Sequence, residues 1–330
     1  MIKILDNQFE EYQSEIKKKK QPDWTHPMLA TLTKKRFSDK DWIYERKLDG
    51  ERCLIFKKGK TVNLMSRNKK EINKIYPELE KALKNQKYDF IADGEVVAFE
   101  NHKTSFSKLQ QRMHSKEKDS RKNISVFYYI FDLLHIDGYD ISKLPLNERK
   151  KILNKAINFD DPIRYSAHIT EDGEDYYEKA CKKGWEGIIA KDARAGYMHS
   201  RSKKWLKFKC ENRQELVIAG YTDPQGERKG FGALLVGFYK NKKLQYAGKV
   251  GTGFTDKVLE ELHGKMKKRE IDKNPYEEED ISVKNVHWIK PELVGEFRFT
   301  EWTNDNRLRH PSFLGLRHDK DAKKVVKEKA

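Results

Sequence analysis

The sequence is short of cysteine, of long apolar runs and of any apolar segment near its start. Its three cysteines, Cys53, Cys181 and Cys210, are too few and too scattered to predict a disulfide framework, and they lack the paired spacing of a structural zinc site. No apolar run approaches the ~20 residues that a membrane-spanning helix needs. Residues 1–20 are acidic and then basic, unlike a secretory signal. We therefore expect a cytoplasmic protein with no membrane partner.

Acidic residues are also in deficit. The 330 residues include 52 Asp and Glu against 69 Lys and Arg, a formal net charge of +17. This surplus indicates an anionic partner, first nucleic acid and second an acidic membrane surface, although a merely solubilising surface gives the same count. The length predicts about two domains, each able to bury a core.

The first domain is expected to cover residues 1–212. Periodic apolar patterns predict helices and apolar or β-branched runs predict strands. We expect helices at residues 6–20, 71–85, 147–156 and 173–183, and strands at residues 42–48, 52–56, 90–99, 125–134, 187–190 and 204–209. Strands with helices between them indicate an α+β domain of antiparallel sheets and helices.

The second domain is expected to cover residues 213–330, because the pattern of predicted elements changes near residues 211–215. Short strands are predicted at residues 215–221, 233–239, 244–250 and 293–300, with one helix at residues 255–268. Few strands and an inserted helix are typical of an all-β barrel of the OB type. Such barrels often bind nucleic acid on one face, in agreement with the net charge.

The segment Glu45-Arg46-Lys47-Leu48-Asp49-Gly50-Glu51-Arg52 has the strongest chemical signal. Asp-Gly between two strands predicts a two-residue hairpin loop, which would put Lys47 directly across from Arg52. Side-chain alternation would put Glu45, Lys47 and Asp49 on one face. Like charges opposite one another destabilise a sheet. We therefore interpret Lys47 as a nucleophile whose pKa is lowered by neighbouring cations and burial.

Other residues extend this candidate site. Lys207 and Lys209 share one face of a predicted strand and would supply more cations, unless they are simply exposed lysines on an edge strand. Glu95 directly precedes the apolar pair Val96-Val97, and Glu186 directly precedes the apolar run Gly187-Ile188-Ile189-Ala190. Their hard oxygen atoms suit Mg²⁺ or Mn²⁺, although exposed strand-end acids look the same in a sequence. No Walker-type P-loop is present, so side-chain cations would have to hold any nucleotide.

Six short motifs occur in an order that resembles the ATP-dependent DNA ligases of the covalent nucleotidyltransferase superfamily. They are residues 47–52, 66–68, 93–95, 131–132, 186–187 and 207–209. Three later segments resemble, more narrowly, the ligase module of the ligase D type, which acts in prokaryotic non-homologous end joining; they are residues 246–254, 301–303 and 308–317. The chain would then be a stand-alone ligase core.

The resemblance implies a reaction and a site. Lys47 would attack the α-phosphate of ATP and carry AMP, which passes to the 5′-phosphate of a nick before the 3′-hydroxyl attacks. The implied ATP or AMP contacts are Glu45, Arg52, Arg67, Glu95, Phe131 (stacked on adenine), Lys207, Lys209 and Arg317, with Glu95 and Glu186 holding Mg²⁺ or Mn²⁺. Arg52, Arg67 and Asn68 would contact the DNA, and Asp49, Asp319 and Lys320 would support the site.

The same resemblance implies partners. They are nicked double-stranded DNA and, as a candidate, the end-binding protein Ku; we expect a monomer that associates with the nucleoid when on DNA. Two alternatives stay open. One is an RNA ligase or a capping-type nucleotidyltransferase of the same superfamily, and the other is a non-catalytic OB-fold nucleic-acid-binding protein.

Overall fold

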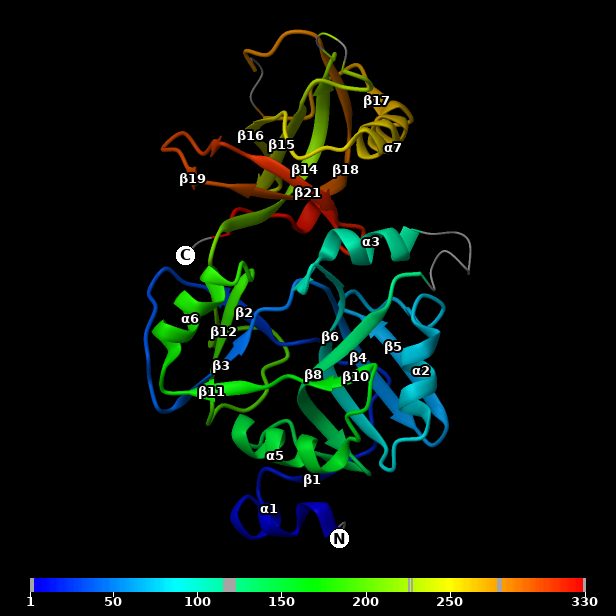
Figure 1. Ribbon diagram of the computed structural model, residues 1–330, viewed down its shortest axis with the longest axis vertical. Helices are drawn as coiled ribbons and strands as arrows, with labels where there is room; N and C mark the ends of the chain where they lie inside the picture. Colours follow the sequence, from blue (N-terminus) through cyan, green and yellow to red (C-terminus); the bar gives the residue numbers. More distant parts are fainter. Residues whose placement is uncertain (1–2, 115–122, 225, 227, 278–280, 329–330) are drawn as a thin grey trace. The chain divides into compact units, whose positions relative to one another are not determined.

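A computed structural model describes residues 3–114, 123–224, 226, 228–277 and 281–328. The chain divides into two compact units between Cys210 and Glu211 (Figure 1). In the described part of the chain, no helix combines the length and apolarity that crossing a membrane requires.

The larger sheet of the first unit has eight strands. Its main order is β1-β9-β8-β6-β4-β5, with β10 beside β8 and β7 beside β6. All pairings are antiparallel except that of β10 with β8. The strands are β1 (Lys17–Lys18), β4 (Glu51–Lys58), β5 (Thr61–Ser66), β6 (Phe90–Glu100), β7 (Lys103–Thr104), β8 (Val126–Ile136), β9 (Tyr139–Asp140) and β10 (Ile163–Tyr165).

A second sheet of five strands, in the order β11-β3-β12-β13-β2, completes the β-structure of this unit. Only β13 and β2 pair in parallel. The strands are β2 (Leu29–Leu32), β3 (Trp42–Arg46), β11 (His168–Thr170), β12 (Gly187–Asp192) and β13 (Arg201–Lys209). The two sheets share a small core in which Phe131 of β8 packs against Trp205 of β13.

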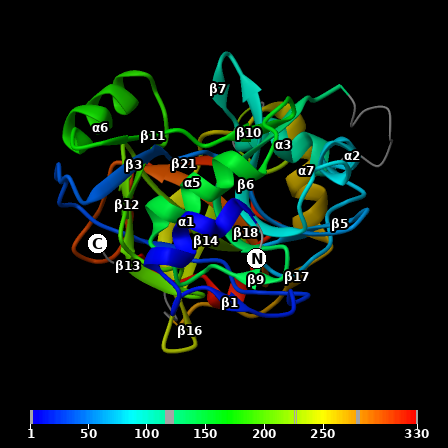
Figure 2. The same cartoon turned by 90° about the horizontal axis from the view of Figure 1, so that it is seen from below.

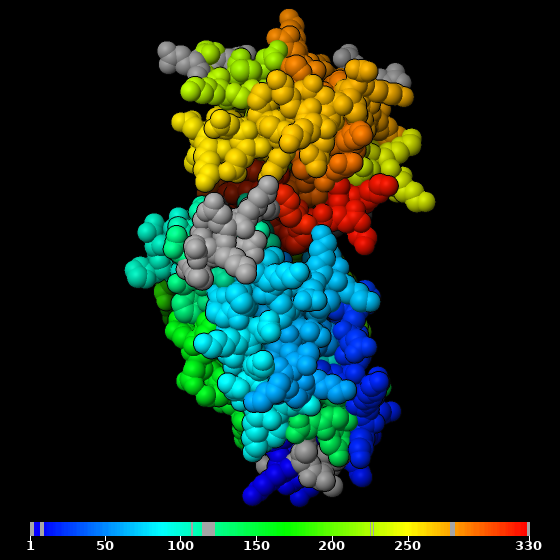
Figure 3. Space-filling model, turned by 90° about the vertical axis from the view of Figure 1, so that its right-hand side faces the viewer, coloured from blue at the N-terminus to red at the C-terminus, as the bar shows by residue number. Residues whose placement is uncertain are grey.

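Helices cover the outer faces of both sheets (Figure 2). Apolar residues of α2, α3 and α5 pack on the larger sheet, and Ala180 of α6 packs on the smaller one. Figure 3 views the side of this unit that β5 and α2 form, in cyan. The helices are η1 (Lys3–Leu5), α1 (Asp6–Glu11), α2 (Pro77–Lys84), α3 (Phe106–His114), α5 (Leu146–Ala156) and α6 (Gly173–Lys182).

The second unit is a six-stranded antiparallel sheet, with α7 (Asp256–Lys267) as its inserted helix. The strand order is β16-β15-β14-β18-β17, with β21 beside β18. This confirms the predicted OB-type domain. Its strands are β14 (Asn212–Thr222), β15 (Leu234–Lys240), β16 (Lys243–Val250), β17 (Glu270–Ile271), β18 (Val286–Phe299) and β21 (Ser312–Leu316); β19 (Glu301–Trp302), β20 (Leu308–Arg309) and η2 (Ala322–Lys324) complete the unit.

The predicted hairpin around Asp49-Gly50 is wrong. β3 pairs with β11 and β12, whereas β4 pairs with β5 and β6, so the chain crosses from one sheet to the other at this point. Gly50 is needed here for close approach: a Cβ atom on it would lie 2.1 Å from the Val96 carbonyl oxygen of β6. Lys47 and Arg52 are therefore not cross-strand neighbours.

Two predicted helices are shorter in the structure. The helix expected at residues 6–20 ends at Glu11, and Lys17–Lys18 instead forms the edge strand β1, which pairs with β9. The helix expected at residues 71–85 begins only at Pro77, whose fixed φ suits a first helical turn. Turns occupy the residues before it.

The structure contains one disulfide bond, which the spacing of the cysteines did not indicate. Cys181, in the last turn of α6, and Cys210, just after β13, are bonded to each other across 29 residues of sequence. Cys53 is free and buried. The sequence does not indicate this bond, because only the fold brings the end of α6 beside the end of β13.

Candidate active site

Lys47 and Glu186 form the centre of the candidate site. Lys47 directly follows β3, and Glu186 directly precedes β12. The Lys47 backbone N–H donates to the Gly187 carbonyl (2.9 Å), and its Nζ donates to Glu186 Oε2 (2.6 Å). Only 20% of the Lys47 side chain and 5% of the Glu186 side chain are exposed. The ladder between β3 and β12 thus fixes both the backbone and the ion pair.

The charge state of Lys47 differs from the sequence expectation. Burial acts to lower the pKa of Lys47, but the carboxylate of Glu186, assisted by those of Asp49 and Glu95, raises it above its usual value. The predicted lowering by a facing Arg52 is therefore wrong. As folded, Lys47 is a cation surrounded by acids, and it must lose its proton before it can act as a nucleophile.

Arg52 is held inside the larger sheet. It pairs in register with Glu95, and its guanidinium binds both carboxylate oxygens of Asp93 at 2.5 and 2.6 Å. Tyr197 donates to the same carboxylate (2.5 Å), and the Met28 carbonyl accepts from Arg52 (3.0 Å). The sheet therefore brings two predicted site residues, Glu95 and Arg52, next to each other. The Arg52 guanidinium, however, is bound to Asp93 within the fold.

Glu45 lies at the centre of a buried cluster that the sequence did not predict. Its Oε1 accepts from Lys150 (2.6 Å), and its Oε2 accepts from Lys191 (2.8 Å) and from Ser166 Oγ (3.1 Å). All four residues are buried. Burial opposes the charged form of Glu45, yet the two lysines hold its pKa below the usual value.

Phe131 lies beside this cluster. The Lys191 ammonium lies 4.2 Å from the ring centroids of both Phe131 and Trp205, and the Arg52 guanidinium lies 4.6 Å from that of Phe131. Cations at these distances are attracted to the rings. The sequence did contain a clue to the role of Lys191. It follows the apolar run Ile188-Ile189-Ala190, and a lysine in a buried strand needs a partner for its charge.

Lys207 and Lys209 of β13 pair with residues of β12, the strand that follows Glu186. Lys209 pairs with Gly187, and Lys207 pairs with Ile189, whose partner on the other side is Glu45. Both lysines lie on the same strand face as Trp205, as predicted from alternation. Arg67 and Asn68 follow β5, whose last residue, Ser66, pairs with Cys53 beside Arg52.

Arg317, Asp319 and Lys320 belong to the second unit. Arg317 binds Asp319 through two nitrogens (both 2.9 Å) and Glu296 through a third (3.0 Å), and Lys320 binds Glu215 (2.9 Å). Burial opposes the charge of Asp319, but Arg317 holds the pKa of Asp319 below its usual value. The predicted contact of Arg317 with pyrophosphate stays a prediction.

The carboxylate oxygens of Glu95 and Glu186 are suitable ligands for a divalent cation. The charges of Glu95 and Glu186 both raise the pKa of Lys47, so the two carboxylates act on the same amine. Among the described residues, no group of three or more His, Cys, Asp or Glu side chains is arranged to hold a metal. Two carboxylates completed by substrate phosphate oxygens are a usual Mg²⁺ arrangement.

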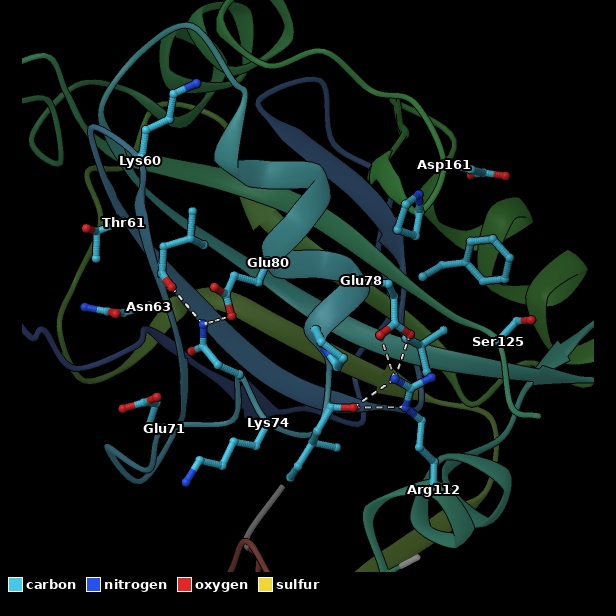
Figure 4. A pocket seen from close by; sticks show the side chains of 17 residues that line it. Lys60, Thr61, Asn63, Glu71, Lys74, Glu78, Glu80, Arg112, Ser125 and Asp161 are labelled. Atoms are coloured by element: carbon cyan, nitrogen blue, oxygen red, sulfur yellow. Dashed lines mark hydrogen bonds and ion pairs between the residues drawn. The ribbon is translucent and has the colours of Figure 1, made fainter. Parts of the chain in front are cut away.

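A pocket of about 1380 Å³ lies elsewhere in the first unit, among β5, α2 and the start of β8 (Figure 4). Its conspicuous polar groups serve the fold: Arg112 binds Glu78 (2.7 Å), and Asn73 binds the Val62 carbonyl (2.7 Å) and Glu80 (2.8 Å). None of the six sequence motifs lines this pocket.

Comparisons with known proteins show the family to which the chain belongs. Residues 27–209 match the family described as ATP dependent DNA ligase domain, and residues 227–320 match the ATP dependent DNA ligase C terminal region. The chain is 34% identical to a multifunctional non-homologous end joining protein LigD of Pseudomonas aeruginosa over 317 residues, 93% of this chain. It is 32% identical to a DNA ligase of Hyperthermus butylicus, over 84% of this chain. It spans 37% and 52% of the length of these curated relatives.

Two solved structures of ligase D are also similar to this chain. A mycobacterial DNA ligase D complexed with ATP and MES is similar with a TM-score of 0.68 and 31% identity, over 92% of this chain and 98% of that one. The ligase domain of Mycobacterium tuberculosis LigD is similar with a TM-score of 0.51 and 32% identity, over the same shares. These matches include both units and all six motifs, so the chain belongs to the family of ATP-dependent DNA ligases.

Proposed function

We propose that this chain seals nicks between a 5′-phosphate and a 3′-hydroxyl in double-stranded DNA, with ATP as cosubstrate and a lysyl-AMP intermediate on Lys47. The observation that carries the proposal is the Lys47–Glu186 pair, with the charge of Glu95 acting on the same amine. The lysines of β13, in register beside it, would face the phosphates.

In the first step the deprotonated Nζ of Lys47 attacks the α-phosphorus of ATP. An N–P bond forms, the bond to the bridging oxygen breaks, and pyrophosphate leaves. Charge builds on the phosphate oxygens, so aimed cations are what this step needs. Lys207 and Lys209 are proposed for that role. Arg317 is proposed to contact the pyrophosphate, with Asp319 and Lys320 in support. Phe131 and Glu45 are proposed to contact the adenine.

In the later steps AMP passes from Lys47 to the 5′-phosphate of the nick, and the 3′-hydroxyl then attacks that phosphate and releases AMP. Arg52, Arg67 and Asn68 are proposed to contact ribose or nick phosphate. They come from the neighbouring strands β4 and β5, which supports a shared surface. Asp49 would support Lys47 through its charge.

A divalent cation, Mg²⁺ or Mn²⁺, would be held by Glu95 and Glu186 and would neutralise phosphate charge. Lys47 would have to lose its proton, and with it the bond to Glu186, before it attacks. Asp49 would still orient the amine electrostatically.

The relatives support a setting in DNA repair. The chain resembles end-joining proteins over only part of their length, so a role in end joining, a contact with Ku, action as a monomer and a cytoplasmic, nucleoid-associated location are proposals. Co-purification of tagged chain with Ku would test the partnership directly.

The test of the proposed function is intact-mass analysis after incubation with ATP and Mg²⁺, followed by sealing assays. Wild type should gain the mass of one AMP and then seal nicked DNA, and Lys47→Ala should do neither. GTP labelling without DNA sealing would favour a capping-type enzyme, and preferential sealing of nicked RNA would favour an RNA ligase. No adduct in wild type would leave a non-catalytic nucleic-acid-binding protein.

A further inference from the structure

Arg46, the residue before Lys47, makes a contact that the proposed reaction does not explain. Its guanidinium carbon lies 4.5 Å from the ring centroid of Trp185, the residue before Glu186. The two residues of the Lys47–Glu186 ion pair are thus each preceded by one partner of a cation–π pair. A displacement of either partner would shift the nucleophile or its carboxylate.

A single hydroxyl joins this pair to the loop that carries Lys47. Thr104 Oγ1, on β7, accepts from Arg46 Nη2 (3.4 Å) and from the backbone N–H of Asp49 (3.3 Å). Thr104 therefore contacts the residue before Lys47 and the residue two places after it. The hairpin of β6 and β7 holds both ends of the short segment that crosses between the sheets.

Trp185 is itself fixed from the other side. Its backbone N–H donates to the Ala180 carbonyl at the end of α6 (3.0 Å), and its ring packs edge-on against Tyr176 (6.0 Å between centroids). The ring of Trp185 is thus a fixed support for the Arg46 guanidinium rather than a loose surface group.

The chemistry of the pair suits its place. Arg46 is partly buried, which lowers its pKa, and its Nε is buried without a hydrogen-bond partner among the described residues. No carboxylate pairs with Arg46 in the described part of the chain, so an aromatic face holds its charge instead. A carboxylate in that position would add negative charge beside Lys47 and beside any phosphate that approaches it.

We propose that Arg46, Trp185 and Thr104 are positioning residues that set the Lys47–Glu186 geometry for the attack on ATP. The inference rests on the proposed function. None of the three need touch ATP, so their effect should appear in the maximal rate of Lys47–AMP formation and not in the KM for ATP. Misplacement of reacting groups by about 1 Å can cost on the order of a hundredfold.

The test is a double-mutant cycle on the rate of AMP transfer to Lys47, followed by quenched intact-mass analysis at several ATP concentrations. Arg46→Met and Trp185→Leu should each lower the maximal rate about tenfold with an unchanged KM, by partial loss of alignment. Trp185→Phe keeps an aromatic face and should stay within about threefold of wild type. The double variant should be no slower than either single one, because the two act as one unit.

Lys87→Met is the control. Lys87 also lies over an aromatic ring of the first unit, 4.9 Å from the Tyr88 centroid, but it precedes no site residue, and the variant should keep the wild-type rate. Thermal unfolding of each variant separates misfolding from misalignment. Wild-type rates in Trp185→Leu, multiplied effects in the double variant, or no rescue by Phe would overturn the inference. A wild type that forms no adduct would instead overturn the proposed function.

Discussion

Lys47 Nζ lies 2.6 Å from Glu186 Oε2, so the structure holds the proposed nucleophile as half of an ion pair. The pairing orients the amine but also protects its proton. In the proposed reaction, Lys47 must therefore lose this proton before it attacks. This arrangement would prevent Lys47 from reacting with other electrophiles while the site is empty.

The first prediction concerns the protonation of Lys47. Glu186→Gln removes the largest influence that raises the pKa of Lys47, so the pKa should fall and the amine should be neutral at lower pH. Competitive labelling with an amine-reactive reagent across pH 7–11, read at the Lys47 peptide, measures this. The variant should label at lower pH than wild type. Glu178→Gln, on the exposed face of α6, is the control; identical labelling curves for Lys47 in wild type and Glu186→Gln would contradict the prediction.

The second prediction concerns the stability of the buried Glu45 cluster. Glu45→Ala leaves the ammonium groups of Lys150 and Lys191 buried without their carboxylate, and breaking a buried pair in this way costs about 3–5 kcal/mol. Denaturant unfolding of the purified chain measures the loss. Asp175→Asn breaks an exposed helix-surface pair with Lys179 and should cost about 0.5 kcal/mol or less. Equal losses of unfolding free energy in both variants would contradict the prediction that the buried Glu45 cluster costs more to break than an exposed ion pair.

The third prediction concerns pH and Lys191. Burial lowers the pKa of Lys191 to about 8, against 10.5 for the free side chain, although Glu45 opposes the shift. Between these two values the unfolded chain binds a proton that the folded chain does not, so this group makes stability rise with pH across that window. Unfolding free energies at pH 7.5, 9 and 10.5 should rise more in wild type than in Lys191→Met. A parallel pH dependence in the two proteins would refute the shift.

The sequence predicted much of the fold. Long apolar strands such as Phe90–Glu100 and Val126–Ile136 were recognised because a buried strand leaves a continuous apolar run. The helix expected at residues 255–268 is α7, and the Thr255 hydroxyl accepts from the Val258 N–H at its start. These features depend on neighbours in the sequence.

The errors came from features that depend on distant partners. Asp49-Gly50 reads as a hairpin turn, but what selects Gly50 is the Val96 carbonyl on another strand. The acids that set the charge of Lys47 include Glu186, 139 residues away. Likewise, Lys150 and Lys191 reach Glu45 from a helix and a neighbouring strand, and no local pattern marks that meeting.

The last prediction separates DNA binding from the first chemical step. Arg67 directly follows β5, next to the strand of Arg52. Of the two contacts proposed for it, ribose and nick phosphate, we expect nick phosphate. Arg67→Ala should leave AMP transfer to Lys47 within about twofold of wild type, because a residue that binds only DNA lends nothing to that step. Its affinity for nicked DNA should fall, and the slope of log K against log salt should become shallower by about 0.9, the value for one lost phosphate contact. Lys60→Ala, a cation at the opposite end of β5 that binds Asn85, is the control and should change neither quantity. An Arg67 variant with the wild-type salt slope would place its charge away from the DNA, and one that fails at AMP transfer would assign Arg67 to the ATP site instead.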